Sequence, residues 1–86
     1  MCWSIFIDLA EGLTDDQRGA LFAALEAIVP DGGCIGPDRG GVEVLYFVVD
    51  APSPEAARSA ATAIMENILA TAAMRVAYTV TAQARS

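Results

Sequence analysis

Apolar residues recur at every second position near both ends of the chain, which predicts a β-strand in each region. Large apolar residues occupy positions 3, 5, 7 and 9, and again positions 74, 76, 78 and 80. Such alternation indicates a strand with one buried face. The inward side chains are expected to be Trp3, Ile5, Ile7 and Leu9 in the first strand and Met74, Val76, Tyr78 and Val80 in the last.

Residues 42–49 are apolar at nearly every position, which is typical of a central strand covered on both sides. A short, weak strand is predicted over residues 33–35. The segment between them, residues 36–41, contains Pro37 and several glycines and is expected to form a turn. The two strands therefore form a predicted hairpin.

Two helices are predicted from capping signals and apolar spacing. Thr14 can cap the first helix, and Gln17 completes a capping box. This helix is expected to end at residues 30–33, which contain proline and glycine. The second helix begins with Ser53 as its cap and Pro54 in its first turn. The buried stripes are expected to be Leu21, Ala24, Leu25 and Ile28 in the first helix and Ala57, Ala61, Ile64 and Ile68 in the second.

The order of elements is strand, helix, strand, strand, helix, strand, which is typical of a ferredoxin-like α+β sandwich. Right-handed crossovers then give a four-stranded antiparallel sheet of order 4-1-3-2, with both helices on one face. A chain of 86 residues has room for one core. We therefore predict a single domain over residues 1–86, with residues 82–86 as a flexible tail.

The two cysteines are expected to be free thiols. Cys2 lies on the first predicted strand and Cys34 on the second, and the third strand separates them. Two strand spacings place them about 9–10 Å apart, whereas a disulfide needs Cα atoms within about 7 Å. No cation is adjacent to either cysteine in sequence, so we expect both to pack as small apolar side chains.

The composition excludes several kinds of chemistry. The chain contains no histidine and no lysine. Without imidazole there is no Ser-His-Asp or Cys-His catalysis and no histidine zinc site, and without lysine there is no Schiff-base chemistry. Two cysteines are too few for a tetrahedral zinc site within one chain. We therefore expect no cofactor and no bound metal, and the chain is more consistent with a non-enzyme.

The charge balance bears on partners and location. Eleven acidic residues against five arginines give a net charge of −6, which is the wrong sign for binding nucleic acid, although Phe6 and Phe47 resemble the base-stacking aromatics of RNA-recognition sheets. The longest uncharged run, residues 76–84, is far shorter than a membrane-spanning helix. Asp8 interrupts the apolar N-terminal segment too early for a secretion signal. We expect a cytoplasmic protein that binds neither membrane nor nucleic acid.

The sheet face away from the helices is the main candidate for a functional surface. Glu43 is costly to bury unpaired, which favours an outward position for the odd-numbered residues of strand 42–49. The opposite phase, with Val44 and Tyr46 outward, stays open. The predicted interface consists of Phe6, Leu45, Phe47, Val49, Ala77 and Thr79.

A polar cluster is predicted at one end of this face. The antiparallel arrangement would bring Asp8, Glu43 and Arg75 close together. An ordinary cross-strand ion pair explains such a group best. The alternative is a set of polar contacts at the mouth of a ligand cavity, where a carboxylate could act as a general base.

The whole-chain pattern resembles a small, uncharacterised actinobacterial domain family. The resemblance rests on a Trp-x-Ile-x-Ile-Asp strand at residues 3–8 and on Leu-Thr-Asp-Asp-Gln at residues 13–17, which opens an Ala/Leu-rich helix. It implies a ferredoxin-like fold, in relatives often followed by a helix-turn-helix segment. No such segment occurs within these residues, so the resemblance implies no direct DNA contact here and no catalytic residues.

These observations favour a non-catalytic interaction or regulatory module. It would form a homodimer or dock a protein partner through its open sheet face, because an exposed apolar sheet face is seldom left uncovered. The alternative is a dimeric α+β barrel that binds or transforms a small hydrophobic molecule, with Asp8 and Arg75 as polar contacts.

Overall fold

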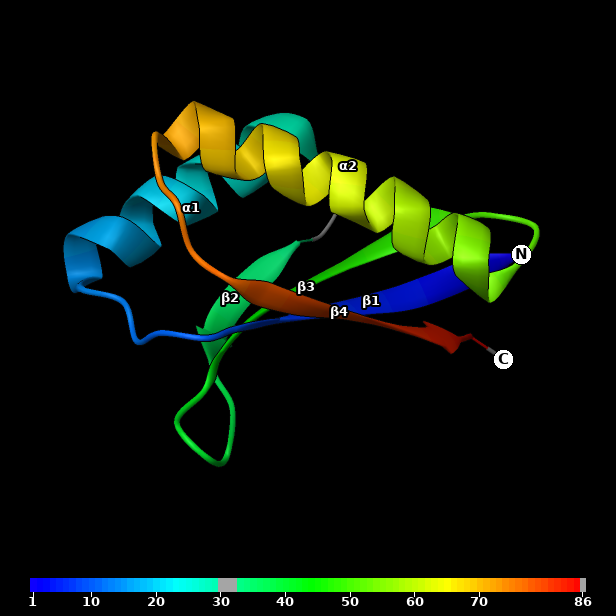
Figure 1. The fold of residues 1–86 in the computed structure, drawn as a ribbon, viewed down its shortest axis with the longest axis horizontal. Helices are drawn as coiled ribbons and strands as arrows, with labels where there is room; N and C mark the ends of the chain where they lie inside the picture. The colour runs from blue at the N-terminus through cyan, green and yellow to red at the C-terminus, as the bar shows by residue number, and fades with distance from the viewer. Residues whose placement is uncertain (30–32, 86) are drawn as a thin grey trace.

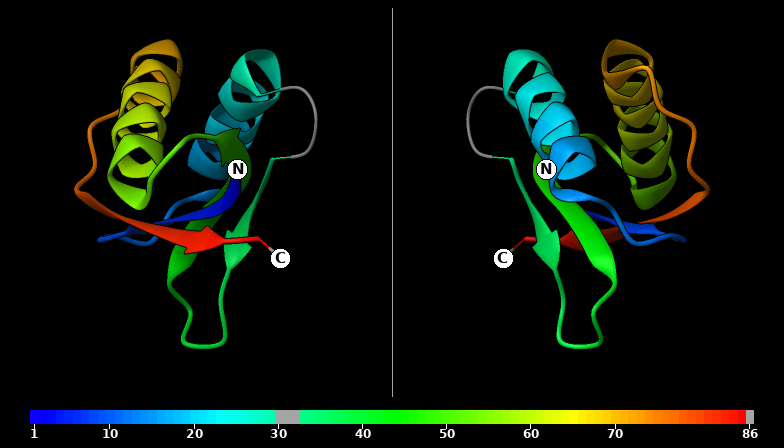
Figure 2. Two further views of the ribbon diagram at one scale, coloured as in Figure 1. Left: turned by 90° about the vertical axis from the view of Figure 1, so that its right-hand side faces the viewer. Right: turned by 90° about the vertical axis from the view of Figure 1, so that its left-hand side faces the viewer.

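Two helices lie over one face of a four-stranded antiparallel sheet and leave the opposite face open (Figure 1 and Figure 2). The computed structural model describes residues 1–29 and 33–85. Its elements are β1 (Cys2–Leu9), α1 (Asp15–Ile28), β2 (Cys34–Pro37), β3 (Glu43–Asp50), α2 (Pro54–Ala72) and β4 (Tyr78–Ala84). The predicted α+β class and order of elements are confirmed.

The strand order in the sheet is β2-β3-β1-β4, which is the predicted order read from the opposite edge. β1 pairs with β3 on one side and with β4 on the other, so β2 and β4 form the two edges. Phe6 of β1 lies opposite Tyr46 and opposite Thr81. Because directly opposed residues share a face, this register decides which side chains meet the helices.

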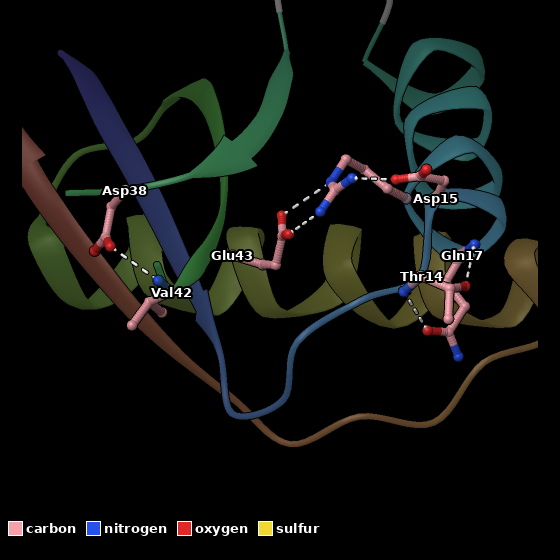
Figure 3. A network of polar contacts seen from close by, with 7 residues as sticks. Thr14, Asp15, Gln17, Asp38, Val42 and Glu43 are labelled. Carbon is pink, nitrogen blue, oxygen red and sulfur yellow. Dashed lines mark hydrogen bonds and ion pairs between the residues drawn. The ribbon is translucent and has the colours of Figure 1, made fainter. Parts of the chain in front are cut away.

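The hairpin between β2 and β3 closes around Asp38. Its side-chain Oδ1 accepts a hydrogen bond from the backbone N–H group of Gly40 at 2.8 Å. It also accepts one from the N–H group of Val42 at 3.0 Å (Figure 3). Gly41 has a φ of 81°, a left-handed conformation that favours glycine. The predicted turn is confirmed, but β2 extends to Pro37 and so takes the first residues assigned to the turn.

The start of α1 matches its prediction in detail. Gln17 N–H donates to Thr14 Oγ1 at 3.1 Å, and Thr14 N–H donates to Gln17 Oε1 at 2.9 Å (Figure 3). This reciprocal pair is the predicted capping box. The side chains that α1 buries are Leu21, Ala24 and Leu25. The stop signal predicted at Pro30, Asp31 and Gly32 lies outside the described residues.

The start of α2 also follows its sequence signals. Ser53 Oγ accepts a hydrogen bond from Ala56 N–H at 3.1 Å, and Pro54 occupies the first turn. The side chains that α2 buries are Ala57, Ala61, Met65, Ile68 and Leu69. Ile64, predicted in this stripe, packs at its margin and is only partly buried. No helix in the described part of the chain is long and apolar enough to cross a bilayer.

The core lies between the sheet and the helix layer. Ile5 and Ile7 of β1 are fully buried, as are the residues opposite them, Phe47 and Leu45. Trp3 is also buried, and its Nε1–H donates to the backbone oxygen of Ala51 at 3.0 Å. The prediction that residues 3, 5, 7 and 9 face the helices is therefore confirmed.

The predicted outward placement of Leu45, Phe47 and Val49 is wrong. All three are buried in the core, because the register with β1 places them on the helix side of the sheet. The structure adopts the alternative phase, in which Val44 and Tyr46 point to the open side and are only partly buried. Glu43 was predicted on the open side because an unpaired carboxylate is costly to bury. In the structure Glu43 is buried without that cost, because its carboxylate has a hydrogen-bonding partner on α1.

The last strand lies further along the chain than predicted. β4 spans Tyr78–Ala84, whereas the alternation predicted a strand over residues 74–81 and a tail from residue 82. Ala82 and Ala84 pair with Ile5 and Trp3, so β1 supplies partners for the residues assigned to the tail. The segment between Ala72 and β4 serves as the connection from α2. Ser86 lies outside the described residues.

We predict that Phe47→Ala lowers the free energy of unfolding by about 3–5 kcal/mol, the usual cost of truncating a fully buried phenylalanine. Urea denaturation followed by circular dichroism measures the change. Tyr46→Ala is the matched control, because this neighbouring aromatic ring is only partly buried and its loss costs less. A greater loss for Tyr46→Ala than for Phe47→Ala would contradict the observed phase of β3.

Candidate functional site: the open sheet face

The open sheet face is defined by the side chains that point away from the helices. The registers place these residues on one side, because opposed residues in paired strands share a face. The open sheet face comprises Cys34 and Gly36 of β2, Val44, Tyr46, Val48 and Asp50 of β3, Cys2, Ser4, Phe6 and Asp8 of β1, and Thr79, Thr81 and Gln83 of β4. Its charged side chains are Asp8 and, at the other end of the face, Asp50, which forms an ion pair with the N-terminal ammonium group at 2.9 Å.

An aromatic pair forms the centre of the open sheet face. The rings of Phe6 and Tyr46 lie opposite each other, with centroids 5.1 Å apart and planes inclined by 51°. A hydrogen bond of 3.3 Å joins the hydroxyl groups of Tyr46 and Ser4 and holds the phenol over β1. The pair separates an apolar half of the face, over β2 and β3, from an uncharged polar half carried by Thr81 and Gln83 on β4.

A hollow of about 610 Å³ lies beside this aromatic pair and is open to solvent. It runs from the centre of the sheet to the β2–β3 hairpin. Its lining residues are Phe6, Asp8, Cys34, Ile35, Gly36, Pro37, Asp38, Val44, Tyr46, Thr81 and Gln83. Its volume falls in the range of small-molecule sites. The hollow therefore combines an aromatic wall with a few polar groups at its rim.

The predicted interface residues are only partly assembled here. Phe6 and Thr79 lie on the open sheet face as predicted. Ala77 is exposed but precedes β4, so it lies at the margin of the sheet. The buried residues 45, 47 and 49 cannot contact a partner while the domain is folded. Their places are taken by Val44 and Tyr46, which are the outward residues of the alternative phase, and by Val48.

The predicted polar cluster of Asp8, Glu43 and Arg75 does not form. Asp8 is exposed on the open sheet face, opposite Val44 and Thr79. Glu43 is buried on the helix side of the sheet, and Arg75 lies in the connection between α2 and β4. The prediction failed because it assigned Glu43 to the wrong face and placed Arg75 within the last strand.

Arg75 instead lines a second hollow together with Glu66 and Tyr78. Burial raises the pKa of Tyr78 above its ordinary value, and the nearby Glu66 carboxylate raises this pKa further. The phenol is thus kept neutral in the folded chain. This hollow lies at the C-terminal end of α2 and is separate from the open sheet face.

Glu43 is held by an arginine that the sequence reasoning missed. Arg18 Nε donates to Glu43 Oε2 at 3.2 Å, and Arg18 Nη2 donates to Glu43 Oε1. Arg18 Nη1 also donates to Asp15 Oδ1 at 3.0 Å, and Figure 3 shows the Glu43 and Asp15 ends of this network. The side chain of Glu43 is 4% exposed and that of Arg18 is 32% exposed. The hydrogen bond to Glu43 is the main cause of a raised pKa for Arg18, which stays charged.

The helical spacing of α1 contained the signal for this pair. Arg18 precedes Leu21 by three residues and Leu25 by seven, so it lies on the stripe that faces the sheet. A cation on a buried stripe requires a carboxylate partner beneath it. Glu43, the buried carboxylate of β3, fills that role.

Both cysteines are free thiols, as predicted, but both are exposed, so the predicted packing as small apolar side chains is wrong. Cys34 lies opposite Tyr46 and therefore in line with Phe6, whereas Cys2 lies four residues away along β1. The distance between the thiols thus includes about 13 Å along the strand as well as two strand spacings. The expected separation of 9–10 Å was too small because it counted only the spacing across the sheet.

The side chains of the open sheet face define the contacts that it can make. The residues described include no group of three or more His, Cys, Asp or Glu side chains that could hold a metal ion. The face offers aromatic and aliphatic contacts, hydroxyl and amide groups, and the exposed carboxylates of Asp8 and Asp50. No family model, no curated protein and no solved structure matches the chain.

We predict that Glu43→Ala lowers the free energy of unfolding by about 1–3 kcal/mol, because it removes a buried hydrogen-bonded partner. Urea denaturation measures the change. Glu55→Ala is the matched control, because Glu55 is exposed and its contact with Arg58 is 3.8 Å long, so its loss matters less. Equal losses for the two variants would show that the carboxylate of Glu43 is not engaged as described.

Proposed function

We propose that this chain is a non-catalytic interaction module that docks a partner protein through its open sheet face. The observation that supports this proposal is the aromatic pair of Phe6 and Tyr46, which lies uncovered at the centre of the sheet beside an open hollow. Aromatic side chains are enriched at the centres of protein interfaces. The order of elements and strands agrees with a ferredoxin-like sandwich, and we propose that fold family for the chain.

The charge of the chain favours protein over nucleic acid as the partner. The net charge is −6, and the open sheet face contains no basic side chain that could contact phosphate. Its polar half instead offers hydroxyl and amide groups, which suit hydrogen bonds at the rim of a protein interface. Asp8 adds a position for a basic group of the partner.

The extent of burial predicts that a single copy of the face binds weakly. Phe6, Val44, Tyr46 and Val48 are already partly buried by their neighbours. Covering the remainder of these four side chains contributes about 2–4 kcal/mol in all. Association costs about 4–15 kcal/mol in lost freedom of motion. A partner must therefore also contact the hollow or the polar rim, and complexes with one copy are expected to be transient.

The hollow supports a second candidate function, the binding of a small hydrophobic molecule. Phe6, Val44 and Tyr46 supply its apolar wall, and Thr81 and Gln83 supply hydrogen-bonding groups. This combination is common in small-molecule sites. Gly36 lines the hollow, and a Cβ added there would meet no atom within 4 Å.

Affinity capture with three immobilised proteins tests docking of a partner. Wild type, Val48→Lys and Ala63→Lys are exposed to a lysate of cells that encode the chain, and bound proteins are quantified by mass spectrometry. Val48 lies on the open sheet face, whereas Ala63 is an exposed position on α2. We expect specific partners to be retained by wild type and Ala63→Lys and to fall at least about tenfold with Val48→Lys, a loss of 1.4 kcal/mol or more.

Two other outcomes would count against docking of a protein. Equal retention by all three proteins would remove the open sheet face as the docking surface. Native mass spectrometry tests the second candidate function. The leucine side chain of Gly36→Leu is expected to fill the hollow. An apolar compound bound to wild type but absent from Gly36→Leu would favour the small-molecule function.

A further inference from the structure

The two edge strands of the sheet, β4 and β2, differ in the backbone N–H and C=O groups that they present to a further strand. Ala10 N–H donates to Ala77 O at 2.9 Å, and Arg85 N–H donates to Cys2 O at 3.2 Å. Both bonds fit the register of β1 with β4 and extend its ladder at either end. In an antiparallel ladder such hydrogen-bonded pairs alternate with non-bonded pairs. The odd-numbered residues of β4 therefore direct their backbone groups toward β1.

The even-numbered residues of β4 direct their N–H and C=O groups outward, away from the sheet. These residues are Tyr78, Val80, Ala82 and Ala84. Their outward groups have no hydrogen-bond partner among residues 1–29 and 33–85. The edge of β4 is thus a row of unpaired backbone donors and acceptors, which is a template for pairing with a further strand.

The opposite edge is blocked. β2 has only four residues, and Asp38 N–H donates to Val42 O at 2.8 Å, in the register of β2 with β3. The same alternation then turns the backbone groups of Ile35 and Pro37 outward. Proline has no N–H, so this edge offers a single outward donor within the strand. A short strand that carries proline is a common means of preventing edge pairing.

The edge of β4 has none of these protective features. The strand contains no proline and no glycine, and the chain has no charged residue from Val76 to Ala84. Edge strands that stay unpaired usually carry charges, proline or a bulge. The pairing of β4 with β1 runs without interruption over the whole strand, so no bulge turns this edge away.

From this asymmetry we propose that β4 pairs with β4 of a second copy of the chain, antiparallel, about a two-fold axis at Thr81. In this register Tyr78 lies opposite Ala84 of the second copy, and Val80 lies opposite Ala82. The outward residues of the two strands then meet as hydrogen-bonded pairs, which gives about eight interchain hydrogen bonds. The proposal is independent of docking at the open sheet face.

A second copy fits this edge because the edge is complementary to itself. On the open side of the joined sheet, Thr81 meets Thr81 of the second copy and Thr79 meets Gln83. Cross-strand hydroxyl pairs of this kind are favourable. Like charges directly opposite one another would destabilise the pairing, but the uncharged run of β4 brings none together, although each chain carries a net charge of −6.

The joined sheet places both open sheet faces on the same side. Its strand order is β2-β3-β1-β4 in one copy, continued by the reverse order in the other. Odd-numbered residues of β4 share a face across the axis, and these residues belong to the open sheet face of each copy. The two aromatic pairs thus lie on one continuous surface, so a partner that contacts both would bind with greater avidity than either face allows alone.

Ala82→Pro tests the proposal. In a single copy the N–H of Ala82 is unused, so proline is tolerated there as on other edge strands. In the paired sheet the same change removes a donor next to the axis. By light scattering at up to about 100 μM, we expect wild type at twice the 9.0 kDa mass of one chain. Ala82→Pro is expected at the mass of one chain, with an unchanged circular dichroism spectrum.

Thr81→Lys tests the same proposal if Ala82→Pro fails to fold. This change places two lysines opposite each other at the two-fold axis and leaves the backbone unaltered. It too is expected at the mass of one chain. Val48→Lys, on the open sheet face but distant from the edge, is the control and is expected to remain a dimer. A monomeric wild type, a Thr81→Lys variant that stays dimeric, or dissociation by Val48→Lys alone would overturn the proposal.

Discussion

The architecture depends on one constraint: a single layer of helices can exclude water from only one face of the sheet. Both faces of β3 are apolar, so the pairing of β3 with β1 decides which face is buried. Phe47 and Leu45 lie opposite Ile5 and Ile7, and this register places all four under the helices. Glu43 shares that face and is accommodated because Arg18 lies above it. The composition of the open sheet face follows from the same pairing.

Features that depend on neighbouring residues were predictable from the sequence, whereas features that depend on distant pairs were not. The capping box at Thr14 and the alternation of β1 are local, and both were predicted correctly. The phase of β3 follows from its pairing with β1, and Glu43 is buried in this phase beside Arg18, which is 25 residues away in the sequence. The open sheet face was therefore predicted as a surface, but half of its side chains were assigned wrongly. The extent of β4 was missed for a related reason, since β1 supplies the partners for Ala82 and Ala84.

The structure also changes the expected strength of binding at the open sheet face. With Phe47 and Leu45 in the core, the face retains one aromatic pair and two valines, each partly covered by its neighbours. Such a surface suits recognition of a partner more than permanent association with it. The proposed pairing of β4 with a second copy would instead use backbone hydrogen bonds at its unprotected edge. The proposed pairing of β4 would join two open sheet faces without enlarging either one.

The reactivity of cysteines placed at Val48 and Val49 tests the phase of β3 most directly. In a background with Cys2→Ser and Cys34→Ser, V48C and V49C are treated with a thiol reagent under native conditions, and the labelling rates are compared with those of the unfolded chains. Val49 is 8% exposed, whereas Val48 points to the open side. We predict rapid labelling of V48C and strong protection of V49C. Protection of V48C with rapid labelling of V49C would contradict it.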